Sequence, residues 1–204
     1  MAIFNDDIAF ASPPRTGNTW VHRVLKTVMG LALADDGRNH SVDWIDHPDQ
    51  FKFTVVRDPS DWLRSWWGCG MRGRHRRLIG VDVVDKLQEC NQGKDMTFEI
   101  FIDRYLNDMP GHTGKVFDYY TEGADKVLRV EQLHYEFEKM VDEDWAVKPA
   151  PGVMAKVLRL PPTNITTSKK REEWPHSMWH DAVIESEKNT AVRFGYEYKL
   201  AEAS

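Results

Sequence analysis

The stretch that decides the fold reads Ile8-Ala-Phe-Ala-Ser12-Pro-Pro-Arg15-Thr16-Gly17-Asn18-Thr19-Trp20. A short apolar run typical of a buried strand leads into a loop rich in proline and glycine. A helix then begins, with Asn18 or Thr19 as the expected cap and apolar residues at helical spacing from Val21 to Met29. Because the first N–H groups of a helix point back toward such a loop, this pattern predicts an anion site.

A second stretch repeats this pattern and reads Phe53-Thr-Val-Val-Arg57-Asp58-Pro59-Ser60-Asp61-Trp62-Leu63-Arg64-Ser65-Trp66-Trp67. The β-branched and aromatic run at 51–56 predicts a central strand, and Pro59 is expected in the first turn of the next helix. Arg57 offers a planar fork for phosphate, and Ser65, two helical turns later, adds a hydroxyl donor. A surface pair of Arg57 with Asp58 and an exposed Ser65 would explain the same residues without a ligand. Two such sites together indicate a ligand with two separate phosphate groups.

Strand and helix patterns alternate along the rest of the chain. They predict strands at 42–45 and 126–131 and helices at 97–106, 133–141 and 178–189, with Phe98, Phe101, Ile102 and Tyr105 facing inward in the first of these helices. We therefore expect an α/β protein in which helices flank a mostly parallel central sheet, formed by one domain over residues 1–204.

Composition narrows the class of protein. A net charge of -5 over 204 residues does not favour a nucleic-acid partner. Cys69 and Cys90 form no disulfide or metal pattern, and reduced thiols are typical of an intracellular protein. The segment 1–7 is acidic and lacks a basic leader, and the apolar run 28–34 is too short to cross a bilayer. We expect a cytoplasmic protein without a membrane partner, and the sequence leaves its oligomeric state open.

The first loop differs from the P-loop pattern G-x-x-x-x-G-K-[ST]. It has no first glycine, Asn18 stands in the place of the lysine, and the cation, Arg15, lies upstream. Its backbone N–H groups can still hold a phosphate, but the usual arrangement for a metal nucleotide is missing. A tight turn with Arg15 in solvent is the alternative.

Together the two stretches resemble the sulfotransferase family that uses 3'-phosphoadenosine 5'-phosphosulfate (PAPS). The segment 14–20 is similar to the family motif P-K-S-G-T-T-W, which binds the 5'-phosphosulfate, and 57–65 is similar to the R-[ND]-P segment with its later serine, which binds the 3'-phosphate. The resemblance implies that the cofactor contacts are Pro14, Arg15, Thr16, Gly17, Asn18, Thr19, Trp20, Arg57 and Ser65. Trp20 would stack on adenine as in the family, or it anchors the core.

Weaker similarities cover more of the chain. Residues 128–133 resemble the late strand of the family, 164–171 its closing loop and 194–196 its tail. The closing loop would add Lys169, Lys170 and Arg171 to the cofactor contacts, although it reads Ser-Lys-Lys-Arg where the family has arginine-lysine-glycine. A solvated loop explains these three residues equally well.

The resemblance implies a P-loop-like fold and sulfuryl transfer from PAPS to an acceptor hydroxyl or amine of a small molecule or glycan. Adenosine 3',5'-bisphosphate (PAP) is released, and no metal is needed. Arg15 replaces the family lysine; since an arginine stays charged, we assign it electrostatic stabilisation rather than proton donation. The alternatives are a P-loop-type nucleotide kinase and a non-catalytic nucleotide-binding module.

A base must take the proton of the acceptor, and histidine suits that task near neutral pH. His40 and His47 both fall between the two phosphate motifs. We prefer His40, which is expected at the carboxyl edge of the sheet, with Asp43 orienting it or acting as the base itself. The basic run from Arg72 to Arg77 either attracts an acidic acceptor or the phosphates of the cofactor, or it forms a solvated face.

Overall fold

The structure is a computed structural model. It describes residues 2–4, 7–35, 42, 48–71, 81–90, 96–146, 148–161, 174 and 176–198. The chain divides into two compact units, Met1–Arg57 with Tyr120–Thr166 and Asp58–Tyr119 with Thr167–Ser204.

The first unit contains a five-stranded sheet in the order β3-β1-β2-β4-β5. The strands are β1 (Ala2–Phe4), β2 (Ile8–Phe10), β3 (Leu33–Asp35), β4 (Phe51–Val56) and β5 (Lys126–Arg129). Strands β2, β4 and β5 run parallel, with Ile8 opposite Phe51 and Phe53 opposite Lys126. The predicted α/β class and the strands β2 and β4 are confirmed. The strand predicted at 126–131 is confirmed only up to Arg129, because the chain enters a 3-10 turn at Val130.

The sheet is mixed rather than mostly parallel, because β1 pairs antiparallel with both β2 and β3. This hairpin was not predicted. The two apolar runs 2–4 and 8–10 are separated by Asn5-Asp6-Asp7, residue types typical of a turn. Three residues are too few for period-two alternation to reveal a strand.

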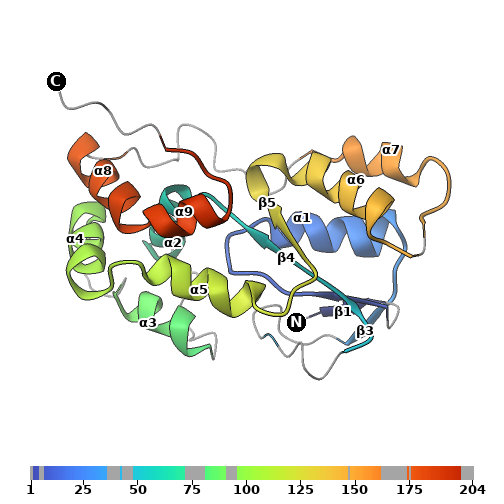
Figure 1. Cartoon of the computed structure of the whole chain (residues 1–204), viewed down its shortest axis with the longest axis horizontal. Helices are drawn as coiled ribbons and strands as arrows, with labels where there is room; N and C mark the ends of the chain where they lie inside the picture. The colour runs from blue at the N-terminus through green and yellow to red at the C-terminus, as the bar shows by residue number, and fades with distance from the viewer. Residues whose placement is uncertain are drawn as a thin grey trace. The chain divides into compact units, whose positions relative to one another are not determined.

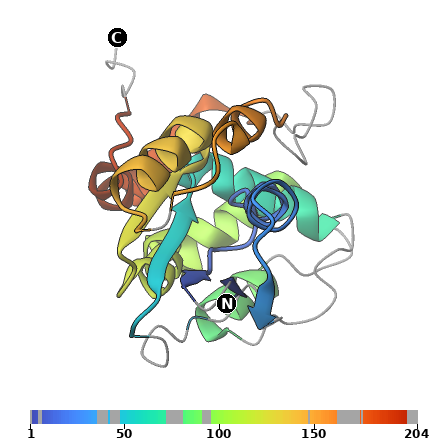
Figure 2. The same ribbon diagram turned by 90° about the vertical axis from the view of Figure 1, so that its right-hand side faces the viewer.

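Three helical segments pack on this sheet. They are α1 (Asn18–Arg23) with its π-helical continuation (Val24–Val28), α6 (Leu133–Glu143) after a 3-10 turn (Val130–Gln132), and α7 (Val153–Leu158). Figure 1 shows α1, α6 and α7 on one side of the strands, and the turned view of Figure 2 agrees. Apolar side chains of these helices and of β2, β4 and β5 form one buried core around Phe10, Phe53 and Phe137.

The second unit is helical. It contains α2 (Pro59–Met71), α3 (Asp82–Cys90), α4 (Phe98–Asp108), most of α5 (His112–Thr121), α8 (Ser177–Ser186) and α9 (Lys188–Arg193). The Thr97 hydroxyl caps α4 by accepting from the Ile100 N–H at 3.3 Å. The four residues predicted to face inward from this helix are buried, which confirms its orientation.

The predicted helix over 178–189 is wrong in one respect, because α8 ends at Ser186 and α9 begins at Lys188. Glu187 lies between them with φ -104° and ψ 10°. Its carboxylate accepts hydrogen bonds from the hydroxyls of Tyr105 and Thr190. The bond from Tyr105 joins residues far apart in the sequence, which helical periodicity cannot reveal, and it accompanies the break.

Aromatic side chains fill the core of the second unit. Trp62 and Trp66 have no exposed surface, and their rings lie 5.4 Å apart. Trp67 packs on Phe98 with 5.1 Å between ring centroids. These three tryptophans therefore belong to the core of the second unit. Within the described ranges, no helix combines the length and the apolar character that a membrane crossing requires.

Candidate functional site

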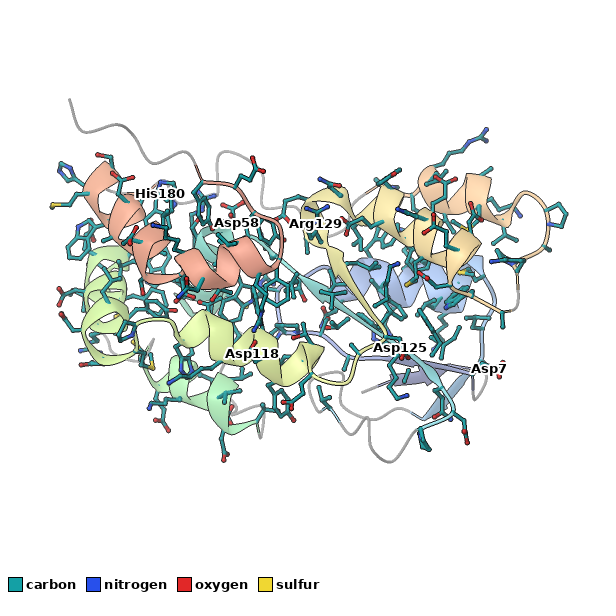
Figure 3. All side chains as sticks on the ribbon, in the orientation of Figure 1. Asp7, Asp58, Asp118, Asp125, Arg129 and His180 are labelled. Atoms are coloured by element: carbon teal, nitrogen blue, oxygen red, sulfur yellow. The ribbon has the colours of Figure 1, made fainter. Side chains whose placement is uncertain are left out.

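The candidate site of the first unit lies at the carboxyl edge of the three parallel strands. The loop 11–17 follows β2, Arg57 follows β4, and Val130 follows β5. Figure 3 labels Arg129 at this end of β5 and Asp125 at the opposite end. Ligands of parallel sheets bind outside the carboxyl ends of the strands, so the topology brings Arg15 and Arg57 to the edge at which a ligand is expected.

Hydroxyl groups inside the loop hold its shape. The Thr16 hydroxyl donates to the Pro13 carbonyl at 2.5 Å, and the Ser12 hydroxyl donates to Asn18 Oδ1 at the same distance. Both hydroxyl-bearing residues are fully buried. The Thr16 hydroxyl and Asn18 Oδ1 therefore hold the loop in shape.

The backbone of the loop is left-handed at two residues. Gly17 has φ 83° and precedes α1 as its N-cap, so the predicted cap at Asn18 or Thr19 is wrong. Asn18 instead uses its side-chain oxygen within the loop. A left-handed residue followed by a right-handed helical one gathers successive N–H groups into a concavity suited to an anion. This is the backbone geometry that the first motif requires.

Arg15 has φ 75°, the single positive φ of a non-glycine residue in the described part of the chain. A side chain with a Cβ is strained there, and such strain is concentrated at functional sites. Arg15 is partly exposed, although the residues on both sides of it are buried. The fold therefore accommodates a strained arginine at the edge of the sheet.

The loop rests on the turn between β5 and α6. A Cβ added to Gly17 would lie 3.2 Å from Leu133 Cδ2 and 3.8 Å from Val130 Cγ2. A side chain at position 17 would thus crowd this turn in addition to being strained by the backbone. The positive φ therefore favours glycine here, and a side chain would also have to displace Leu133.

Trp20 belongs to the core. It is 2% exposed, and its ring centroid lies 4.8 Å from that of His134 and 5.6 Å from that of Phe137. This packing favours the core-anchor interpretation over stacking on adenine. Trp20 therefore connects the first turn of α1 to α6.

The second motif begins at the end of β4. Arg57 is half-buried and belongs to the first unit, whereas Ser65 lies half-buried in α2 of the second unit. Asp58 Oδ1 accepts from the Ser60 hydroxyl at 2.6 Å and from the Asp61 N–H at 2.9 Å, so Asp58 caps α2. The predicted start of this helix at Pro59 is confirmed. The carboxylate of Asp58 therefore has a structural task at the start of α2.

Several predicted site residues lie outside the described residues. These are the candidate bases His40, Asp43 and His47, the closing-loop residues Lys169, Lys170 and Arg171, and the basic run Arg72–Arg77. In the part of the chain that the structure describes, no three His, Cys, Asp or Glu side chains gather in a way that would hold a metal ion.

Sequence reasoning missed Arg129 and Glu136. Arg129 is the last residue of β5, and its Nε donates to Glu136 Oε1 at 2.7 Å. In the sequence, this pair is an arginine at the end of a strand and a carboxylate about one turn into the next helix. This spacing predicts an ion pair only when the length of the turn between the strand and the helix is known.

Comparisons with protein-family models, with curated proteins and with solved structures found no match to this chain. Its function therefore rests on the residues and on the geometry described above.

Proposed function

We propose that this protein is a PAPS-dependent sulfotransferase with a P-loop-like fold, which acts on a hydroxyl or amine of a small molecule or glycan. The observation that supports this most is the strained Arg15 in a loop at the same sheet edge as Arg57. Each arginine follows one of two neighbouring parallel strands, and each lies in a segment that resembles a phosphate motif of the family. Two cations at one edge suit a nucleotide with phosphate groups on both its 3' and 5' positions.

The proposed reaction is an in-line sulfuryl transfer. The acceptor oxygen or nitrogen attacks the sulfur, the bond from sulfur to the 5'-phosphate oxygen breaks, and PAP leaves. Arg15 and the loop N–H groups stabilise the charge that develops on that oxygen. Arg57 binds the 3'-phosphate, and Ser65 keeps the supporting role that the resemblance implies. His40 is the proposed base that takes the acceptor's proton, with His47 and Asp43 as alternatives.

Nucleotide selectivity tests this proposal. Adenosine 3',5'-bisphosphate should raise the melting temperature more than AMP or ATP at equal concentration, because only it carries a phosphate for each arginine. A thermal-shift series without metal and with magnesium measures this. Equal shifts for the three nucleotides would refute the two-site proposal, and a preference for magnesium-ATP would favour a kinase.

The Arg57→Ala variant sharpens the test. We expect it to lose about 2 kcal/mol of PAP binding, which is about thirtyfold in Kd, because a charge-assisted contact to the 3'-phosphate is removed. Arg23→Ala is the matched control, since Arg23 is exposed at the end of α1. An unchanged Kd in Arg57→Ala would show that Arg57 is structural. PAP binding without sulfuryl transfer to any acceptor would favour a binding module.

A further inference from the structure

A compact ion pair fixes the turn on which the Arg15 loop rests. One carboxylate oxygen of Glu136 accepts from Arg129 Nε at 2.7 Å and lies 2.6 Å from its terminal nitrogen. The other oxygen accepts from the backbone N–H of Arg129 at 2.5 Å. We call this arrangement the Arg129–Glu136 clamp. Charge-assisted bonds are stronger than those between neutral groups, and the side chain of Glu136 is only 14% exposed.

The clamp closes around the residues that support the loop. Val130 and Leu133, the two residues that Gly17 approaches, lie between Arg129 and Glu136 in the sequence. The clamp therefore fixes both ends of the short segment that supports Gly17. Figure 3 shows Arg129 where β5 passes into α6, at the start of this segment.

The same helix also holds the first turn of α1. The rings of His134 and Phe137, on either side of Glu136 in α6, contact the ring of Trp20. The segment 17–20 is therefore supported at both of its ends by residues at the start of α6. A shift of the start of α6 would move both of these contacts. The clamp is the polar link that prevents such a shift relative to β5.

We propose that Glu136 is a positioning residue for the nucleotide site. Through the clamp it holds the turn 130–133 against Gly17, and so keeps the Arg15 loop in the conformation that binds the 5'-phosphate. The positioning of the loop stands on the contacts above, and its consequence for a nucleotide rests on the proposed function. Glu136 itself contacts no ligand in this scheme.

Glu136→Gln tests the proposal, because it keeps the shape of the side chain and removes its charge. Hydrogen exchange of the nucleotide-free variant should be about tenfold faster at the amides of residues 15–20, while β4 amides exchange as in the wild type. PAP should bind about tenfold more weakly. Glu143→Gln is the control on the same helix, since its pair with Lys139 is 3.8 Å long and about half exposed.

The two measurements separate the two proposals. Unchanged exchange in residues 15–20 of Glu136→Gln, or an equal increase in β4, would overturn the positioning role whether or not the nucleotide binds. Wild-type protein that fails to bind PAP would refute the proposed function, and the exchange measurement would still decide the role of Glu136. Should Glu136→Gln not fold, Arg129→Lys keeps the charge and the backbone donor but lacks the fork. It must then show faster exchange in the loop, and unchanged exchange would overturn the proposal.

Discussion

At the scale of single residues, Arg15 combines strain with a proposed function. Its left-handed backbone is unfavourable for any residue with a Cβ, and glycine removes that strain. Arg15→Gly and Arg15→Ala both lose the guanidinium, but only the glycine variant relieves the backbone. We expect Arg15→Gly to be more stable than Arg15→Ala by about 1 kcal/mol, as measured by chemical denaturation.

Both variants should bind PAP at least about tenfold more weakly than the wild type, because the charge on the 5'-phosphate side is lost. Arg15→Lys, which retains a positive charge, should lose less. Equal stability of the glycine and alanine variants would show that the strain is negligible. The sequence predicts Arg15 and Gly17 as site residues, but it does not indicate that an arginine adopts a conformation that favours glycine.

At the scale of elements, the start of α2 carries a cap inside the second motif. Asp58 accepts from the Asp61 N–H, and the proline at 59 lacks an N–H that would need a partner. We expect Asp58→Ala to lower the free energy of unfolding by about 1 kcal/mol and Asp58→Asn to lower it much less, since asparagine also accepts at this position. Urea denaturation of both variants measures the difference. Equal losses would show that the charge of Asp58, rather than its capping bond, is what stabilises the helix.

Elements with strong local patterns were predictable, and those held by tertiary contacts were not. Strand β4 is rich in β-branched and aromatic residues, and α4 has its apolar residues at helical spacing. Helix α5 escaped prediction because it contains Gly114 and two threonines, which favour helix weakly. A Cβ at Gly114 would lie 2.5 Å from Thr190 Oγ1, so the glycine lets α9 approach, a requirement visible only in the folded unit.

At the scale of the whole molecule, the sequence predicts those parts of the candidate site that depend on the two motifs and on the order of the strands. The parallel order of β2, β4 and β5 follows from the alternation of strands and helices, and it places both motif arginines at one edge. The clamp of Arg129 with Glu136 could not be predicted, because it depends on how the chain turns between β5 and α6. The buried network of the second unit likewise joins residues far apart in the sequence.

That network makes the second unit sensitive to pH. Glu187 is 1% exposed and bonds to Tyr105 of α4 and Thr190 of α9. Burial raises the pKa of Glu187 above its ordinary value of 4.5, and hydrogen bonds from Tyr105, Thr190 and the backbone of α5 only partly offset this. Burial and the nearby charge of Glu187 raise the pKa of Tyr105 in turn. The folded unit therefore favours the protonated form of Glu187.

A group whose pKa is raised by folding stabilises the fold fully below its unfolded pKa, and this contribution is lost as the pH rises through the folded pKa. Above pH 4.5 we therefore expect the wild type to lose stability relative to Glu187→Gln, by at most about 1.4 kcal/mol per pH unit. His112 affects stability in the opposite sense, because burial lowers its pKa and its contribution to stability is lost as the pH falls. Since His112 is present in both proteins, the difference in stability between wild type and Glu187→Gln isolates the effect of Glu187. Hydrogen exchange of α4 and α9 between pH 4 and 8, corrected for the intrinsic rate, measures the effect, with β4 as the reference. A difference between wild type and Glu187→Gln that stays constant over this range would show that Glu187 is equally ionised in the folded and unfolded chains.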